Sequence, residues 1–322
     1  MTKRKSTFRL LAFAAALAAL QGCGGGGGGF PITLVPAGNS DSQTQTESKV
    51  PETDTSSPAP TPETTPETTP TDRYAPVAGS EPAPSLSDPQ KGSTADVGSA
   101  SEGIYESFFG HTFITAAGQL ARKDLLDWTW GSITVNGTDW SFNPETRSLH
   151  ITSKTVTGSG TFTSRTSMQG TYSEDGGASS AWGPLKYSQA NALAITLANL
   201  QGKWSVADAT RYNMSLEFDA NGVLSGTTSG PQLGVCSLSG AAVQVEPGTA
   251  KNMFYLAMTA VNAATGSERA CTLDTSLPFA GLAGVVLTAA GIYPQNGYFR
   301  TFAFHVKTPN LHLLTNYLRK EQ

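Results

Sequence analysis

The strongest constraint on the fold is a period of two in the apolar residues from Ser101 onward, interrupted by turn residues about every ten positions. In Phe299–Val306, for example, one face of a strand would carry Phe302, Phe304 and Val306. Asn136-Gly137 is a typical hairpin turn, with Ile133–Val135 before it and Trp140–Phe142 after it. This pattern predicts an all-β chain of short antiparallel strands.

The second half of this region contains eight candidate strands. They are Trp204–Val206, Met214–Phe218, Val223–Thr228, Val235–Val243, Met253–Val261, Arg269–Leu273, Leu282–Thr288 and Tyr298–Val306. So many short strands favour a closed barrel, because closure removes exposed sheet edges. The predicted fold class is therefore all-β, with an antiparallel up-and-down eight-stranded barrel that follows a smaller β-rich region.

Shorter strand-like runs make up that smaller region. They are Thr112–Ala116, Trp128–Val135, Ser148–Ser153, Gly160–Thr163 and Gly170–Ser173. Between the two parts, Leu193, Leu197 and Leu200 have helical spacing, which predicts a short helix between Ser188 and Gly202. Leu311, Leu314 and Leu318 suggest a second short helix near the C-terminus.

The first residues have the pattern of a secretory leader. Met1–Arg9 carries four basic residues and no acidic one, and Leu10–Leu20 is continuously apolar. This apolar run is too short to span a bilayer but suits the core of a signal peptide. The apolar core of the leader ends at Leu20, shortly before Cys23.

The next segment has the composition of a disordered tether. It begins with the six glycines Gly24–Gly29, and 12 of the 19 prolines fall between Pro31 and Pro89. Residues 31–100 also contain ten acidic and three basic residues, a net charge of −7. Such a chain cannot bury enough apolar surface to offset its loss of conformational entropy on ordering. The predicted division is thus a leader (1–22), a linker (23–100), a β-rich region (101–187) and a barrel domain with a short entry helix (188–322).

Leu20-Gln21-Gly22-Cys23 resembles the bacterial lipobox, and the layout as a whole is similar to proteobacterial outer-membrane lipoproteins of unassigned activity. The resemblance implies that the leader is cut after residue 22 and that Cys23 carries a diacylglycerol, which anchors the chain in the outer membrane. Gly24, where inner-membrane lipoproteins carry Asp, agrees with the outer membrane. An ordinary cleaved signal, with Cys23 as a free thiol, is the alternative.

Gly202-Lys203-Trp204 resembles the opening motif of lipocalin and calycin barrels. In that family an Arg of the last strand packs across the Trp at the closed end of the barrel. The resemblance implies this role for Arg300, through a cation–π contact with Trp204.

Cys236 and Cys271 form an even pair, which in an oxidising compartment predicts a disulfide; two buried thiols and a reactive pair are the alternatives. The four histidines have no metal-ligand spacing, and no Gly-x-Ser-x-Gly motif occurs. We therefore predict no catalytic residue, metal site or cofactor. Nucleic acid is also excluded as a partner, because the folded part has no basic stripe.

Trp128 and Trp130 share one face of a strand and are either ligand-contacting aromatics or core residues. The sequence thus favours a binding module for a small apolar ligand or an envelope protein. A structural lipoprotein with a filled barrel is the alternative, and a hydrolase is the weakest of the three. Large inward side chains would indicate a filled barrel, whereas small ones, as in Gly281–Gly284, favour a cavity.

Overall fold

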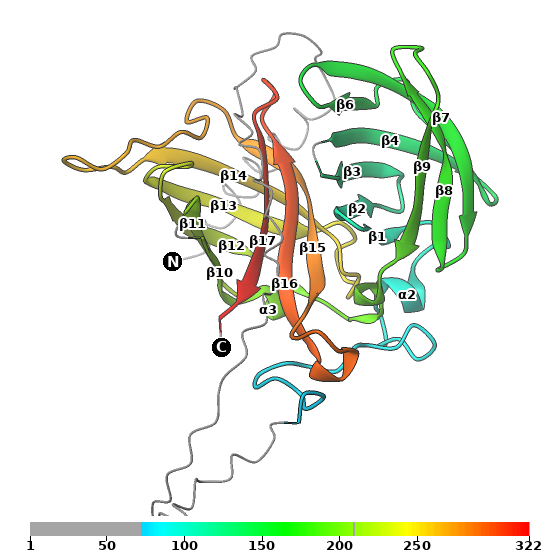
Figure 1. The fold of residues 1–322 in the computed structure, drawn as a ribbon, viewed down its shortest axis with the longest axis horizontal. Coiled ribbons are helices and arrows are strands. Elements are labelled where there is room, and N and C mark those ends of the chain that lie inside the picture. The colour runs from blue at the N-terminus through cyan, green and yellow to red at the C-terminus, as the bar shows by residue number, and fades with distance from the viewer. Residues whose placement is uncertain (1–71, 126, 209, 322) are drawn as a thin grey trace, which may run out of the picture.

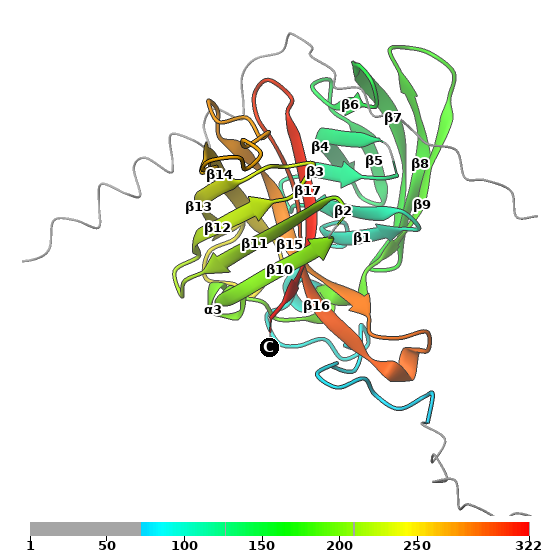
Figure 2. The same cartoon turned by 60° about the vertical axis from the view of Figure 1, so that its left-hand side comes forward.

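The computed structural model describes residues 72–125, 127–208 and 210–321. These residues form two antiparallel β-barrels that lie side by side (Figures 1 and 2). The predicted all-β fold is confirmed, but the smaller β-rich region is itself a closed barrel.

The first barrel is built from nine strands. They are β1 (Gly103–Ser107), β2 (Gly110–Ile114), β3 (Gln119–Lys123), β4 (Trp128–Asn136), β5 (Asp139–Phe142), β6 (Arg147–Leu149), β7 (Ser153–Thr163), β8 (Ser167–Glu174) and β9 (Ser180–Tyr187). The sheet order is β3-β2-β1-β9-β8-β7-β5-β4-β6, and β3 also pairs with β4. This last pairing closes a ring of strands, and β6 pairs with both β4 and β7 beside β5.

The second barrel is the predicted eight-stranded up-and-down barrel. Its strands are β10 (Gly202–Asp208), β11 (Tyr212–Phe218), β12 (Val223–Ser229), β13 (Cys236–Gln244), β14 (Phe254–Asn262), β15 (Phe279–Ala289), β16 (Tyr298–Lys307) and β17 (Leu313–Lys320).

Two of the expected elements of this barrel are wrong. Arg269–Leu273 lies in the loop between β14 and β15, and the expected C-terminal helix is strand β17. Leu314, Asn316 and Leu318 of β17 are buried and alternate with more exposed residues. A spacing of four between leucines therefore fits one face of a strand as well as one face of a helix.

Each barrel closes along a short seam between its first and last strands. In the first barrel β1 and β9 pair only through Tyr105–Tyr187 and Glu106–Lys186. In the second, β10 and β17 pair only through Trp204–Lys320 and Ser205–Arg319. Both barrels begin with a glycine at positive φ, Gly103 at 139° and Gly202 at 103°.

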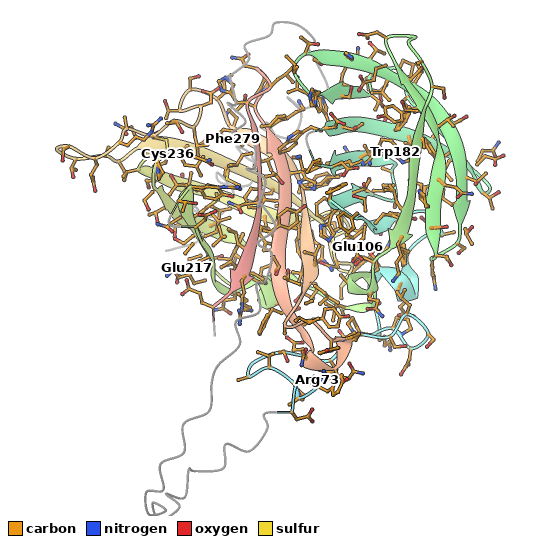
Figure 3. The ribbon with its side chains drawn as sticks, viewed as in Figure 1. Arg73, Glu106, Trp182, Glu217, Cys236 and Phe279 are labelled. Carbon is orange, nitrogen blue, oxygen red and sulfur yellow. A yellow bond between two sulfur atoms is a disulfide. The ribbon has the colours of Figure 1, made fainter. Side chains whose placement is uncertain are left out.

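Large apolar side chains fill both barrels. The first encloses Tyr105, Trp140, Phe162, Met168 and Trp182, among others. Every strand of the second contributes a buried apolar residue, including Trp204, Phe218, Phe254, Phe279 and Phe302. Figure 3 labels Trp182 in one barrel and Phe279 in the other. The expectation that the small residues Gly281–Gly284 line a cavity is not met. A Cβ at Gly281 would lie 2.0 Å from the His305 carbonyl oxygen on β16, so this glycine allows a close approach of neighbouring strands.

A third apolar cluster joins the barrels. Ile104, Phe113 and Ala121 on the outer face of the first barrel pack with a patch of the second that includes Leu282, Val286 and Ala303. This cluster fixes the two barrels against each other as a hydrophobic core does within a domain.

Buried polar groups accompany this apolar contact. The Lys251 ammonium lies 2.6 Å from Glu102 and 2.8 Å from Glu246. Burial alone would lower the pKa of Lys251, but its hydrogen bonds with both carboxylates raise it above the ordinary value. His305 of the second barrel is buried, and its Nε2 lies 3.1 Å from the His111 carbonyl oxygen of the first.

The tether was expected to extend to residue 100, but the described part of this segment packs on the barrels. Helix α2 (Thr94–Val97) buries Ala95, and the Asn252 backbone N–H donates to Thr94 Oγ1. Earlier in the segment, Glu81 forms an isolated bridge with Tyr298. The predicted end of the linker at residue 100 is therefore wrong for the described residues from 72 onward. Their small and polar side chains are held in place by residues that are distant in the sequence.

Between the barrels, two short turns replace the single predicted helix. These are the 3-10 turn η2 (Gln189–Ala192) and α3 (Leu197–Leu200), and Leu193 between them is extended. Ser188 caps η2 as expected, because its side chain accepts from the Ala190 N–H. Among the described residues, no helix is both long and apolar enough to cross a membrane.

Candidate functional site

Four loops gather at one end of the first barrel. Antiparallel pairing brings together the β1–β2, β3–β4, β6–β7 and β8–β9 connections, and we call their residues 108–109, 124–125, 127, 150–152 and 175–179 the rim. Side-chain contacts link neighbouring loops. His150 Nδ1 lies 2.9 Å from Asp127 Oδ1, and Ser107 Oγ lies 3.5 Å from Asp124 Oδ1.

Three of the four rim loops expose large apolar side chains. The exposed fractions are 93% for Phe108, 54% for Phe109, 60% for Leu125 and 78% for Ile151. The Phe108 and Phe109 rings contact each other edge to face, with centroids 4.8 Å apart. Isolated exposed apolar residues are common, but several on adjacent loops of a rigid scaffold are typical of an interaction surface.

A charged layer lies below these loop tips, inside the barrel. The Arg122 guanidinium stacks 4.1 Å from the centre of the Trp182 ring and pairs with Asp124. Among the described residues, Arg122 Nε and Trp182 Nε1 have no hydrogen-bond partner although both are buried. Figure 3 places Trp182 among the strands of this barrel.

Beside this layer is an open hollow of about 250 Å³, lined by Lys154, Tyr172, Glu174, Gly177, Ala178 and Ser180. Lys154 Nζ lies 3.0 Å from Glu174 Oε2, and the Ser148 hydroxyl donates to the other oxygen of Glu174. The hydrogen bond from Ser148, with that from Lys154, lowers the pKa of Glu174. Glu174 in turn raises the pKa of Lys154. Both groups are therefore charged at neutral pH.

The two tryptophans that the sequence singled out as aromatic ligand contacts lie between the barrels. Trp128 and Trp130 are half-buried on the outer face of β4. The Trp128 ring is 5.9 Å from His305, and Lys307 Nζ is 5.5 Å from the centre of the Trp130 ring. Their observed contacts are thus with the second barrel.

At the end of the second barrel, Gly202 begins β10 and Trp204 is fully buried, with its indole N–H donating to the Leu200 carbonyl. The role expected for Arg300 is wrong. The cation over the Trp204 ring is Lys320 Nζ, at 5.2 Å, because β17 rather than β16 pairs with β10. Arg300 instead binds Glu81 at 2.8 Å.

The predicted disulfide joins Cys236 and Cys271. It connects the start of β13 to the loop between β14 and β15, where Cys271 packs against the barrel core. Cys23, the predicted lipidation site, lies outside the described residues.

Sequence reasoning missed the rim. Phe108 and Phe109 were not singled out from the sequence, although two consecutive large apolar residues between strands break the period of two. Leu125 and Ile151 carry no such signal. In the described part of the chain, no group of three or more His, Cys, Asp and Glu side chains is arranged to hold a metal ion.

Comparisons of the chain with protein-family models, with curated proteins and with solved structures give no match.

Proposed function

We propose that the chain is a lipid-anchored protein of the outer membrane that binds another envelope protein through the rim of its first barrel. The observation that carries the proposal is the set of exposed side chains Phe108, Phe109, Leu125 and Ile151 on three neighbouring loops. Exposing them to water is unfavourable, and docking against an apolar surface would remove that exposure.

The filled interiors favour a protein partner over a small apolar ligand held inside the second barrel. Trp204, Phe254 and Phe302 occupy the space that such a ligand would need. Binding, rather than catalysis, is the activity that we assign to this surface.

The membrane part of the proposal rests on the leader and on Cys23. If Cys23 carries the lipid, wild-type cells fed an alkyne-tagged fatty acid will label the protein, and Cys23→Ala will abolish the label. Labelling that persists in this variant would contradict lipidation at this residue.

The partner is tested by placing a photo-crosslinking amino acid in the full chain at position 108 or 151 and irradiating living cells. A matched control is position 261, because Val261 is 55% exposed on the second barrel. We expect a discrete crosslinked species at 108 and 151 that is absent at 261, and its identification by mass spectrometry names the partner. The double variant Phe108→Ser with Ile151→Ser should then weaken binding of the purified partner at least tenfold.

A structural lipoprotein without a partner remains the second candidate, because both barrels are filled. Equal crosslinking patterns at 108, 151 and 261 would favour it.

A further inference from the structure

We propose that the hollow lined by Lys154, Tyr172, Glu174, Gly177, Ala178 and Ser180 binds a neutral sugar unit of a glycan. The hollow lies at the ends of β7, β8 and β9, and its lining residues Gly177 and Ala178 belong to the one rim loop that has no large apolar tip. This inference goes beyond the protein-binding rim and requires neither the lipid nor the partner.

Charge balance in the hollow argues for a neutral ligand. Its lining contains one cation and one anion, Lys154 and Glu174, and they pair with each other at 3.0 Å. The neighbouring carboxylate of Asp175 accepts from the Thr155 backbone N–H at 2.8 Å. An anionic or cationic ligand would have to break the Lys154–Glu174 pair to find its counter-charge, whereas a neutral ligand leaves the pair intact.

Hydrogen-bonding capacity argues for a ligand with several hydroxyl groups. Within the described residues, the hydroxyls of Tyr172 and Ser180 make no hydrogen bond. The Lys154 ammonium has donors beyond the one given to Glu174, and the carboxylate has further lone pairs. The hollow thus offers donors and acceptors together, the combination that sugar hydroxyls use. An apolar ligand would leave these groups without water or a partner.

One aromatic side chain, Tyr172, lines the hollow and could contact the less polar face of a sugar ring. The Tyr172 ring meets Trp182 edge to face, with centroids 5.7 Å apart, and Arg122 covers Trp182. Tyr172 is therefore held in place and presents an apolar ring with a polar tip. Gly177 and Ala178 also line the hollow, and their side chains take up little of its space.

Size limits the ligand to a single unit. A volume of about 250 Å³ is smaller than the hollows that enclose drug-sized molecules. Because the hollow is open on the rim side, the remainder of a glycan would extend outside it.

The test is an array of neutral glycans, ending in glucose, galactose or N-acetylglucosamine, and acidic glycans, ending in sialic or uronic acid. The labelled full chain should bind a subset of the neutral glycans and none of the acidic ones. For the best array ligand, calorimetry should show at least a tenfold loss of affinity in Tyr172→Ala and an intermediate loss in Tyr172→Phe, which keeps the ring. Glu174→Gln should also weaken binding, because it leaves Lys154 unpaired.

The matched control is Thr171→Ala, on the same strand but on the outer face of the barrel, which should bind like the wild type. Ile151→Ser should also bind the glycan normally, so failure of the protein-binding proposal can be told apart from failure of this one. Binding only to acidic glycans, binding to no glycan, or normal binding by a folded Tyr172→Ala protein would each overturn the inference.

Discussion

Gly284 on β15 lies directly against Ile104 on β1, so that a Cβ at position 284 would be 2.9 Å from Ile104 Cδ1. The Asn252 carbonyl oxygen and the Phe113 ring, at 3.1 and 3.2 Å from the same point, close the other sides. A hydrogen atom at this position is therefore what allows the two barrels to pack so closely.

Adding one methyl group here should destabilise the protein. We expect Gly284→Ala to lower the free energy of unfolding by about 1–3 kcal/mol, because overpacking forces side chains away from their preferred rotamers. Ile104→Val removes the Cδ1 atom that collides, so the double variant should be more stable than the sum of the single changes predicts. Urea denaturation of the four proteins measures this coupling, and strict additivity would contradict the contact.

The ion pair between the barrels gives a second prediction. Lys251→Met leaves the carboxylate of Glu102, whose side chain is only 4% exposed, without its cation. Loss of one partner of a buried pair typically costs about 3–5 kcal/mol. Adding Glu102→Gln removes the uncompensated charge and should restore part of the loss in the same denaturation assay. A double variant that is less stable than Lys251→Met would contradict this explanation.

The buried ring of His305 should make the stability of the protein depend on pH. Burial of its ring, together with the neighbouring His111, lowers the pKa of His305 to about 3. In the unfolded chain the ring takes up its proton near pH 6.5, so the unfolded state binds more protons between about pH 6.5 and 3. The free energy of unfolding should therefore fall as the pH falls through this range, by up to roughly 1.4 kcal/mol per pH unit from this group.

The measurement is urea denaturation at several pH values between 7.5 and 5. This range lies above the ordinary carboxyl range, where Glu174, whose pKa is lowered by Ser148 and Lys154, would also contribute. His305→Gln should show a shallower dependence than the wild type. Identical slopes would show that His305 does not carry the effect.

The disulfide should stabilise the protein by restricting the unfolded chain. Cys236 and Cys271 are 35 residues apart, and closing a loop of this length is worth about 4 kcal/mol by the chain-entropy model, with measured values for native disulfides of about 2–5 kcal/mol. A reductant should lower the urea midpoint of the wild type by a matching amount. The double variant Cys236→Ala with Cys271→Ala should start at the lower midpoint and be insensitive to the reductant.

Much of the fold could be predicted from the sequence, because apolar side chains that point into a barrel alternate along each strand with more polar side chains that point outward. Seven of the eight strands expected in the second barrel are present, and so is the Asn136-Gly137 hairpin. The eighth strand was misplaced because Leu314 and Leu318 suit a helix and a strand equally. Strands such as β1 and β3 were missed because both of their faces are covered, one by the barrel core and the other by the second barrel.

The candidate site was harder to predict than the fold. The sequence identifies Cys236 and Cys271 as a pair because they have few alternative partners. It does not place Trp128 against His305 or bring Phe108, Leu125 and Ile151 to one end, because these relationships depend on strand register and on how one barrel meets the other. Arg300 and Lys320 lie at the ends of adjacent strands, and only the pairing of β10 with β17 decides which cation reaches Trp204.

The two seams have a consequence for a chain that is synthesised from its N-terminus. The last contact of the first ring, between Tyr105 and Tyr187, needs no residue of the second, so this ring is complete in sequence before the second begins. Until β14 to β16 arrive, Ile104 and Phe113 form an uncovered apolar face. The order of synthesis therefore creates a transient intermediate in which the first barrel exposes an apolar surface. In the complete protein, the second barrel buries this surface. A chaperone that binds the newly made protein would have this face, rather than the rim, as its first target.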